Sequence, residues 1–299
     1  MSAAGCPQNV NSFCHTLRRR PRLMEIVSPD RMQMTGGRQY HVGCAPGEVA
    51  RYLLTPGDPG RIPRIAALWD EAVEVAYNRE YRTFTGKIGG VPVSATSSGI
   101  GSPSTAIAVE ELAAIGVDTF IRVGSTGVIQ EGIEIGDVVI SSGAIRLDGT
   151  SMMYVRPEYP AAPHYEVVLA LVSAAEELGY RYHVGITASV DSFYTGEGRP
   201  GLGGYTQSFV NDLIPDLRAA RVLNFDMESG TLFTLANLFG LRAGTICGVA
   251  TQRLKGESVL GGGEKESIAV ANEAVKILAA MDAAKARKQK RYWYLSVVK

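Results

Sequence analysis

From about Val49 onward, short apolar runs alternate with segments in which apolar residues recur at helical spacing. The apolar runs predict strands at Arg51–Thr55, Glu80–Thr85, Val91–Ser97, Thr119–Val123, Asp137–Ser141, His183–Thr187, Val222–Phe225 and Ala243–Val249. The helical spacing predicts helices at Ile62–Trp69, Pro103–Ile115, Tyr165–Leu178, Ser208–Ala219, Met227–Phe239 and Glu264–Met281. This alternation predicts an α/β fold with a mostly parallel or mixed sheet that is covered on both faces.

End signals are clearest for the helix that starts near Pro103. Ser102 is expected to be its N-cap, Pro103 suits the first helical position, and Gly116 stands just past its end. No linker or repeat divides the region. We therefore expect one domain at residues 40–285, a partly disordered N-terminal extension at 1–39 and a basic tail at 286–299.

The N-terminal segment allows several interpretations. Residues 1–24 lack acidic side chains and contain an arginine cluster at 18–22, which faintly resembles a transit peptide. A disordered tail, or an upstream start codon with Met24 or Met32 as the natural start, agrees with the sequence at least as well.

Charge and composition narrow the class of function. Lys+Arg and Asp+Glu number 30 each in 299 residues, so the whole chain shows no bias toward nucleic acid or a membrane surface. No apolar run approaches the roughly 20 residues of a membrane span. Any site for an anion must therefore be local.

Cysteine and histidine patterns give no metal or disulfide signal. The cysteines at 6, 14, 44 and 247 are scattered without a C-x-x-C pair, which is typical of a reduced, cytoplasmic protein. The histidines at 15, 41, 164 and 183 have no evident partners, and there is no G-x-S-x-G sequence, so a hydrolase triad is not indicated.

Glycine-rich segments need separate treatment. Residues 196–201 match the spacing G-x-G-x-x-G. Pro200 lies within this stretch, and two further glycines come after it where a helix should begin, so a dinucleotide fold is rejected. There is no G-x-x-x-x-G-K-[ST] loop for a nucleoside triphosphate. The whole loop 195–207 is either mobile or folded around something.

Arginines beside strand ends suggest a different anion site. Arg61 follows the turn "TPGDPG", and Arg122 precedes the glycines of "GSTG". Each arginine alone, like Arg79 in "NREYRTF", is more often a surface or ion-pair residue. A guanidinium next to free backbone N–H groups and hydroxyls is nevertheless what a tetrahedral oxyanion needs.

The segment at residues 224–229, "NFDMES", ends one predicted strand and opens a helix. Asp226 and Glu228 are acids that the start of a helix favours. A carboxylate can also accept two hydroxyl protons from a sugar diol. Both interpretations remain open on these residues alone.

Taken together, these motifs resemble the nucleoside phosphorylase family, and within it the bacterial enzymes that act on uridine. The resemblance covers roughly residues 40–283. Its motifs are "PGDPGR" (56–61), "NREY" (78–81), "SGIGSPSTAIAVEELAAIGVDTFIRVGSTG" (98–127), "GDVVI" (136–140), "IRLDG" (145–149), "SFYTGEGR" (192–199), "FDMES" (225–229) and "QR" (252–253). Such members have a single-domain, three-layer α/β/α fold with a partly barrel-like mixed sheet.

The resemblance implies a role for each matching residue. Phosphate would bind Gly57, Arg61, Arg79, Arg122 and Ser125. Ribose would contact His41, Asp226, Met227 and Glu228. The base would contact Phe193, Glu197, Arg199 and Arg253. Catalysis is expected from Arg122, Arg199, Glu228 and Arg253, with Arg79 and His41 supplied by a neighbouring subunit.

The implied reaction is reversible phosphorolysis of a pyrimidine nucleoside, with inorganic phosphate as co-substrate and no organic cofactor. A phosphate at Arg61 would be attracted by the arginine and the helix start together. Some members hold a monovalent cation, K⁺, at a dimer contact matching Glu80, Ile100 and Ser104. A homo-oligomer is expected, a dimer at least and a hexamer built from three dimers in the bacterial members.

Two residues depart from the family pattern. Ser125 stands where Thr is usual and keeps the hydroxyl. Glu197 stands where Gln is usual, and an ionised Glu accepts hydrogen bonds but cannot donate one to uracil O2. Either Glu197 is protonated in the complex, or the base preference has moved away from uracil.

Three alternatives remain open. The purine branch carries Ser-Asp where this chain has "ATQR" at residues 250–253, so a purine enzyme is less favoured. A nucleosidase would use water and would not need Arg61, Arg79 and Arg122 together. A non-catalytic nucleoside-binding protein of the same fold is the third, because fold does not fix function.

Overall fold

The structure is a computed structural model that describes residue 30 and residues 32–295. The arginine cluster at 18–22, Met24, Cys6, Cys14 and His15 lie outside the described residues. The division into 1–39, 40–285 and 286–299 stays a prediction.

A ten-stranded mixed sheet forms the centre of the protein. Its strands are β3 (Tyr52–Thr55), β4 (Glu71–Asn78), β5 (Tyr81–Ile88), β6 (Val91–Thr96), β7 (Thr119–Val128), β8 (Val138–Leu147), β9 (Tyr182–Val190), β10 (Asn224–Asp226), β11 (Arg242–Gln252) and β12 (Glu257–Ser258). Their order is β12-β11-β8-β9-β10-β7-β3-β6-β5-β4, and β11 also pairs with β7 in parallel. The strands from β7 to β11 thereby close into a ring, which confirms the partly barrel-like mixed sheet.

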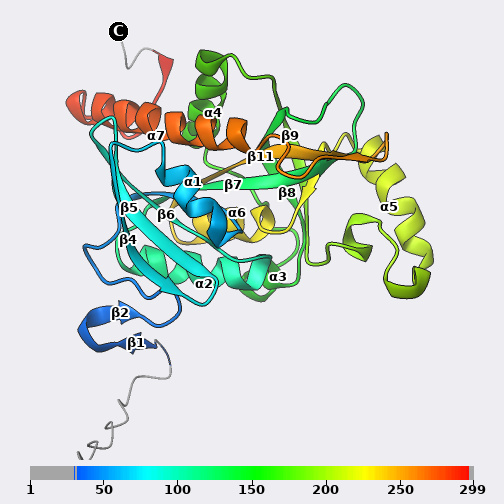
Figure 1. The fold of residues 1–299 in the computed structure, drawn as a ribbon, viewed down its shortest axis with the longest axis horizontal. Helices are drawn as coiled ribbons and strands as arrows, with labels where there is room; N and C mark the ends of the chain where they lie inside the picture. Colours follow the sequence, from blue (N-terminus) through cyan, green and yellow to red (C-terminus); the bar gives the residue numbers. More distant parts are fainter. Residues whose placement is uncertain (1–29, 31, 296–299) are drawn as a thin grey trace, which may run out of the picture.

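Helices lie on both sides of this sheet (Figure 1). They are α1 (Ile62–Ala66), α2 (Ser102–Ala114), α3 (Thr150–Tyr154), α4 (Tyr165–Leu178), α5 (Ser208–Ala219), α6 (Ser229–Leu238) and α7 (Glu264–Arg287). Single 3₁₀ turns occur at Thr35–Gly37, Pro59–Arg61, Thr195–Glu197 and Leu202–Gly204, and the strands β1 (Gln33–Met34) and β2 (Arg38–Gln39) form a separate hairpin. Helices α4 and α7 pack on one face, while α2 and α6 pack on the other.

Alternating side chains build one core on each face. Leu54 of β3 belongs to the core under α4 and α7, whereas its neighbour Leu53 belongs to the core under α2 and α6. Ile121 and Phe120 of β7 divide in the same way. Successive residues of a strand point to opposite faces, so a continuous apolar run is needed where both faces are covered. The expected three-layer arrangement is confirmed.

Several element predictions need correction. The bounds of α4 and α5 are confirmed, but α1 is shorter than expected and ends at Ala66. Strand β4 was not predicted, because it lies at the sheet edge and its residues are mostly exposed, so no apolar run marks it. Helix α3 is too short for helical periodicity to show.

The end of one site strand, β7, was predicted wrongly. Strand β7 does not stop at Val123 but continues through "GSTG" to Val128. Both of its edges are hydrogen-bonded there, to antiparallel β10 and to parallel β11, so the glycines lie inside a strand. Arg122 therefore projects from the middle of a strand and not from a loop.

The predicted N-cap of α2 is also wrong. Gly101 is the N-cap, with φ 92°, and Ser102 is the first helical residue. The Ser102 hydroxyl donates to the carbonyl of Met227 instead of capping the helix. A positive φ favours glycine, so the "GIG" sequence at residues 99–101 sets the start of this helix. Gly116, with φ 109°, follows the helix end as expected.

Part of the predicted basic tail, around Trp293, packs against the domain. Helix α7 continues to Arg287, past the predicted Met281. The backbone N–H of Trp293 donates to Glu166 Oε1 at 3.0 Å, and its carbonyl accepts from Tyr165 at 2.9 Å. Trp293 also packs against the core under α4 and α7.

Close packing at Gly248 of β11 yields a stability prediction. A Cβ built there would lie 2.2 Å from the carbonyl oxygen of Gly263, which is backbone and cannot move away cheaply. We expect Gly248→Ala to lower the free energy of unfolding by at least ~2 kcal/mol. Gly149→Ala is the control, because its Cβ would meet only Asp191 Oδ2, at 3.5 Å. Equal thermal denaturation of the two variants would contradict the packing argument.

Candidate active site

Arg61 reaches β7 from the loop after β3. Asp58 caps the 3₁₀ turn by accepting from the Gly60 N–H at 2.8 Å, which holds the loop in place. The Arg61 guanidinium donates to the Val123 carbonyl and to Ser125 Oγ, each at 2.9 Å, and the residue is 8% exposed. The predicted meeting of Arg61 with Ser125 is therefore present in the structure.

The helix beside Arg61 contributes less than the sequence suggested. Helix α1 has five residues, so its dipole is too short to attract an anion substantially. The charge near Arg61 is instead the carboxylate of Glu264, 3.1 Å from its Nη2. The interpretation that a helix start and an arginine jointly hold an anion stays a prediction.

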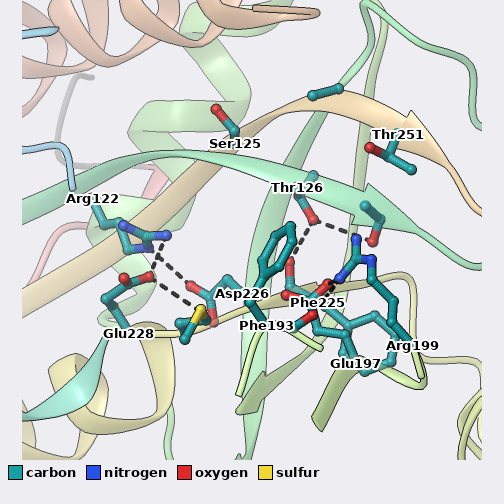
Figure 2. A pocket seen from close by; sticks show the side chains of 13 residues that line it. Arg122, Ser125, Thr126, Phe193, Glu197, Arg199, Phe225, Asp226, Glu228 and Thr251 are labelled. Atoms are coloured by element: carbon teal, nitrogen blue, oxygen red, sulfur yellow. Dashed lines mark hydrogen bonds and ion pairs between the residues drawn. The ribbon is translucent and has the colours of Figure 1, made fainter. Parts of the chain in front are cut away.

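Arg122 lies between two buried carboxylates. Its Nε donates to Asp226 Oδ2 at 2.9 Å, and its Nη2 pairs with Glu228 Oε2 at 2.5 Å (Figure 2). Burial alone would lower the pKa of Arg122, but the carboxylates of Glu228 and Asp226 outweigh it and raise the pKa. Arg122 is therefore a permanent cation with a fixed orientation.

Glu228 is held on both sides. Its Oε1 accepts from the backbone N–H of Gly101 at 2.7 Å, and its Oε2 accepts from the Met227 N–H at 3.2 Å. Burial raises the pKa of Glu228, and the Arg122 charge opposes that rise. Asp226 has a side chain with no exposed surface and also accepts from the Ser229 hydroxyl at 2.5 Å.

A second group of residues gathers at the other end of the pocket. Arg199 forms a short ion pair with Glu197, donates to the Phe193 carbonyl at 2.6 Å and lies 4.2 Å from the centre of the Phe193 ring. Arg253 donates to the Glu197 carbonyl at 2.8 Å. Burial raises the pKa of the Glu197 carboxyl, and the Arg199 charge opposes it.

Most of these groups line two adjoining cavities, whereas Arg253 and Glu264 line neither. The first has a volume of about 250 Å³ and is lined by Arg122, Ser125, Thr126, Gly127, Phe193, Glu197, Arg199, Phe225, Asp226, Met227, Glu228, Ala250 and Thr251. The second has a volume of about 710 Å³ and is lined by Gly57, Asp58, Pro59, Arg61, Glu80, Gly99, Ile100, Ser104, Arg122, Gly124, Ser125 and Glu228. Arg122, Ser125 and Glu228 line both, so the cavities meet at these residues.

Two predicted residues lie elsewhere in the same chain. Arg79 is exposed in the turn between β4 and β5, with φ 56°, and lies 5.6 Å from the ring of Tyr40. His41 pairs through Nδ1 with Glu111 at 2.6 Å. Neither lines the two cavities, which agrees with their expected supply from a neighbouring subunit without testing it.

The three residues expected to hold a cation do gather. Glu80, Ile100 and Ser104 line the second cavity together, and Ser104 Oγ donates to the Ile100 carbonyl at 3.3 Å. A carboxylate, a carbonyl and a hydroxyl are oxygen donors that suit a hard cation such as K⁺. Among the described residues, no group of three or more His, Cys, Asp or Glu is placed to hold a metal.

Some residues of the site and its surroundings were not predicted from the sequence. Thr126, Gly127 and Phe225 line the first cavity because β7 and β10 pair there. Glu264 was missed although three consecutive glycines, at 261–263, precede it, and such a run signals a close backbone approach.

No helix in the described part of the chain is long and apolar enough to cross a membrane.

Comparison with known proteins agrees with this geometry. Residues 51–286 match the phosphorylase superfamily. The uridine phosphorylase of Thermococcus kodakarensis is 63% identical over 270 residues, which cover 90% of this chain and 97% of that protein. The uridine phosphorylase of Escherichia coli is 42% identical over 221 residues, 73% of this chain and 87% of that protein.

A relative with a different named activity is almost as similar as the latter. The guanosine phosphorylase of Halorubrum lacusprofundi is 42% identical over 212 residues, 71% of this chain and 83% of that protein. The superfamily match and the likeness over most of the length confirm the resemblance seen in the motifs. The chain belongs to the phosphorylase superfamily and is a nucleoside phosphorylase homologue.

Proposed function

We propose that this protein catalyses the reversible phosphorolysis of uridine, giving uracil and ribose 1-phosphate, in pyrimidine nucleoside salvage. One observation supports this most directly: two adjoining cavities have Arg61 at one end, Arg122, Ser125 and Glu228 where they meet, and Glu197 with Arg199 at the other end. The distribution of charge along the cavities fits an anion, a sugar and a polar base in that order. The names of the relatives support the same reaction.

The phosphate end acts by positioning and charge. Gly57, Arg61, Arg122 and Ser125 would bind phosphate and hold one of its oxygens toward C1′ of the ribose. The glycosidic bond breaks as the base takes its electron pair, and the phosphate oxygen bonds to C1′. Fixed cations around the nucleophile reduce the entropic and electrostatic cost of this step.

The sugar lies next to Glu228 and Met227. The Glu228 carboxylate would accept the 2′- and 3′-hydroxyl protons, and its partners Arg122 and Gly101 keep it in place. Asp226 lines the first cavity, but its side chain is fully buried and paired with Arg122, so we propose that it acts on ribose only by orienting Arg122.

The base end stabilises the departing anion. Phe193 would stack on the pyrimidine, and Arg199 with Arg253 would donate to the carbonyl oxygen that gains negative charge. Both arginines are linked to Glu197, Arg199 through the carboxylate and Arg253 through the backbone carbonyl. Glu197, Arg199 and Arg253 therefore form one hydrogen-bonded group at the base end.

A neighbouring subunit would complete the site. Within one chain, Arg61 and Arg122 adjoin the carboxylates of Asp226, Glu228 and Glu264, so a phosphate dianion needs a further cation. Exposed Arg79 of a second copy would supply it, and that copy's His41 would bond the 5′-hydroxyl. We propose a dimer as the minimal unit and a hexamer of three dimers as the assembly.

No organic cofactor enters this proposal. Glu80, Ile100 and Ser104 would hold K⁺ at the dimer contact, where the ion would stabilise the arrangement of the neighbouring loops. The proposed location is the cytoplasm, which suits the free thiols of Cys44 and Cys247.

A second substrate class, the 6-oxopurine nucleosides, is favoured by Glu197 and by the guanosine phosphorylase relative. Guanine presents two neighbouring donors, N1–H and the 2-amino group, which match the two oxygens of an ionised carboxylate. Uracil presents one donor, N3–H, beside an acceptor, O2. Thr251, which lines the base cavity, has a hydroxyl that can donate to a purine nitrogen.

The shared site predicts complementation between two damaged copies. We expect Arg61→Gln or Arg79→Gln alone to lower kcat/KM for uridine phosphorolysis about 100-fold, because each removes charged hydrogen bonds to phosphate. Co-expression of the two variants should restore about a quarter of wild-type activity, because half of randomly paired dimers are mixed and each holds one intact site.

Base release measured with and without phosphate supplies the control for that experiment. Release that does not require phosphate would contradict phosphorolysis, and failure of the mixed oligomers to recover activity would contradict the shared site. Arg218→Gln, at a residue that lines neither cavity, should leave activity unchanged.

The protonation state of Glu197 predicts a pH dependence for uridine, and its replacement by Gln should affect uridine and guanosine differently. The raised pKa keeps Glu197 protonated to higher pH than usual, so kcat/KM for uridine should fall as pH rises through that pKa. Glu197→Gln should remove this fall for uridine and lower kcat/KM for guanosine ten- to a hundredfold, roughly the effect of one lost charged hydrogen bond.

Exposed Glu131→Gln is the matched control for a lost carboxylate, since that side chain is 86% exposed. If Glu197→Gln changes neither the pH profile nor the ratio of the two substrates, Glu197 does not read the base.

A further inference from the structure

We propose that Glu264, the first residue of α7, is a positioning residue that orients Arg61 toward phosphate. This inference rests on the proposed phosphorolysis and adds to it a residue outside the cavities. Neither cavity is lined by Glu264, whereas Arg61 lines the larger one. The carboxylate therefore stands behind the arginine and not in the place of the substrate.

The contacts of Glu264 join two arginines. Its Oε2 lies 3.1 Å from Arg61 Nη2, and its Oε1 lies 2.6 Å from Arg64 Nη1. Arg64 also pairs with Asp58 at 3.2 Å, and Asp58 caps the turn that carries Arg61. The chain of contacts closes on itself and fixes the guanidinium relative to its own loop.

Arg61 keeps donors free for a ligand after these contacts are made. One Nη donates to the Val123 carbonyl, and the other meets Ser125 Oγ and Glu264. Its Nε is a buried donor that has no acceptor among the described residues. A buried donor without an acceptor is costly, so an anion bound beside the guanidinium would satisfy it.

Electrostatics favours a carboxylate at this place. Burial lowers the pKa of Arg61, the charges of Arg122 and Arg64 lower it further, and Glu264 raises it. Two guanidinium groups that share a poorly solvated cavity repel each other. Glu264 offsets this repulsion and holds the Arg61 guanidinium in place in the absence of phosphate.

The position of Glu264 is fixed by close backbone packing. A Cβ on Gly263 would lie 2.6 Å from the Val249 N, and one on Gly262 would lie 2.8 Å from the Val249 carbonyl oxygen. Together with the Gly248–Gly263 contact, this leaves the start of α7 pressed against β11. The carboxylate is thus placed by rigid elements, which a positioning residue requires.

A plain helix-start role for Glu264 gives a different expectation. Acids in the first turn favour the helix dipole, and Glu266 occupies the same turn of α7. In the described part of the chain, the ion-pair partner of Arg61 is Glu264 and not Glu266. Glu266→Gln is therefore a matched control that removes the same charge from the same turn.

The test is steady-state phosphorolysis with phosphate and uridine varied separately. Glu264→Gln should raise the KM for phosphate about tenfold, while kcat at saturating phosphate and the KM for uridine stay within about twofold. Glu266→Gln should change none of the three. An unchanged or lower phosphate KM in Glu264→Gln would overturn the proposal, since removal of a mere repulsive charge would tighten phosphate binding.

Binding without turnover gives a second readout. Phosphate should raise the Tm of the wild-type protein, and Glu264→Gln should need about tenfold more phosphate for the same rise. Arg64→Gln, at a half-exposed side chain, frees one oxygen of Glu264 and should raise the phosphate KM two- to threefold even if Glu264→Gln does not fold. A wild-type phosphate KM in Arg64→Gln would count against the proposal.

Different results would overturn the proposed phosphorolysis and the role of Glu264. A wild-type protein that releases base without phosphate would overturn the proposed function itself. A phosphate-dependent wild type, together with a Glu264→Gln variant of normal phosphate KM, would overturn only the role of Glu264.

Discussion

Two buried arginines cannot lie side by side in this fold unless carboxylates surround them. Arg122 is 6% exposed and Arg61 is 8% exposed, and both line the same cavity. In a poorly solvated interior, like charges repel strongly and unpaired charges are costly. Asp226 ends β10, Glu228 is the N-cap of α6 and Glu264 begins α7. These three elements must therefore be placed correctly around the two arginines.

The same arrangement gives the cavity no surplus of positive charge within one chain. With its cations already compensated inside the chain, the cavity is not a general attractor of anions. Phosphate would bind most tightly where further donors converge. In the proposed dimer, Arg79 of a second copy supplies such a donor. Preorganised charges of this kind need little rearrangement at the moment of reaction.

Backbone proximity supports this arrangement of charges. A Cβ on Gly124 would lie 2.7 Å from Cys247 Sγ and 2.9 Å from Arg122 Nη2, so the guanidinium folds closely over its own strand. Gly248 similarly allows the start of α7 to approach β11. Glycine inside a strand normally weakens it, and here the loss is offset by the approach of charged groups and a helix end.

Local signals identified most of the regular elements, and the motifs singled out many of the residues that line the two cavities. They failed for two reasons. Strand β4 pairs with the neighbouring β5, but it lies at the sheet edge and is mostly exposed, so no apolar run marks it. Strand β7 continues because β10 and β11 flank it, and Ser102 donates to Met227 instead of capping α2. The partners of β7 and of Ser102 are far away in sequence, so no window of local residues contains them.

The sequence by itself determined the alternation of strands and helices, the layered α/β class and the family, because these follow from periodicity and from motifs read in order. Only the tertiary structure decided that Glu264 pairs with Arg61 from outside the cavities, that Asp226 is buried against Arg122, and that Arg79 and His41 lie outside the cavities of their own chain. The first two contacts join residues 203 and 104 positions apart, so they depend on how the sheet closes. Sheet closure is a property of the whole chain and is not encoded in any one segment.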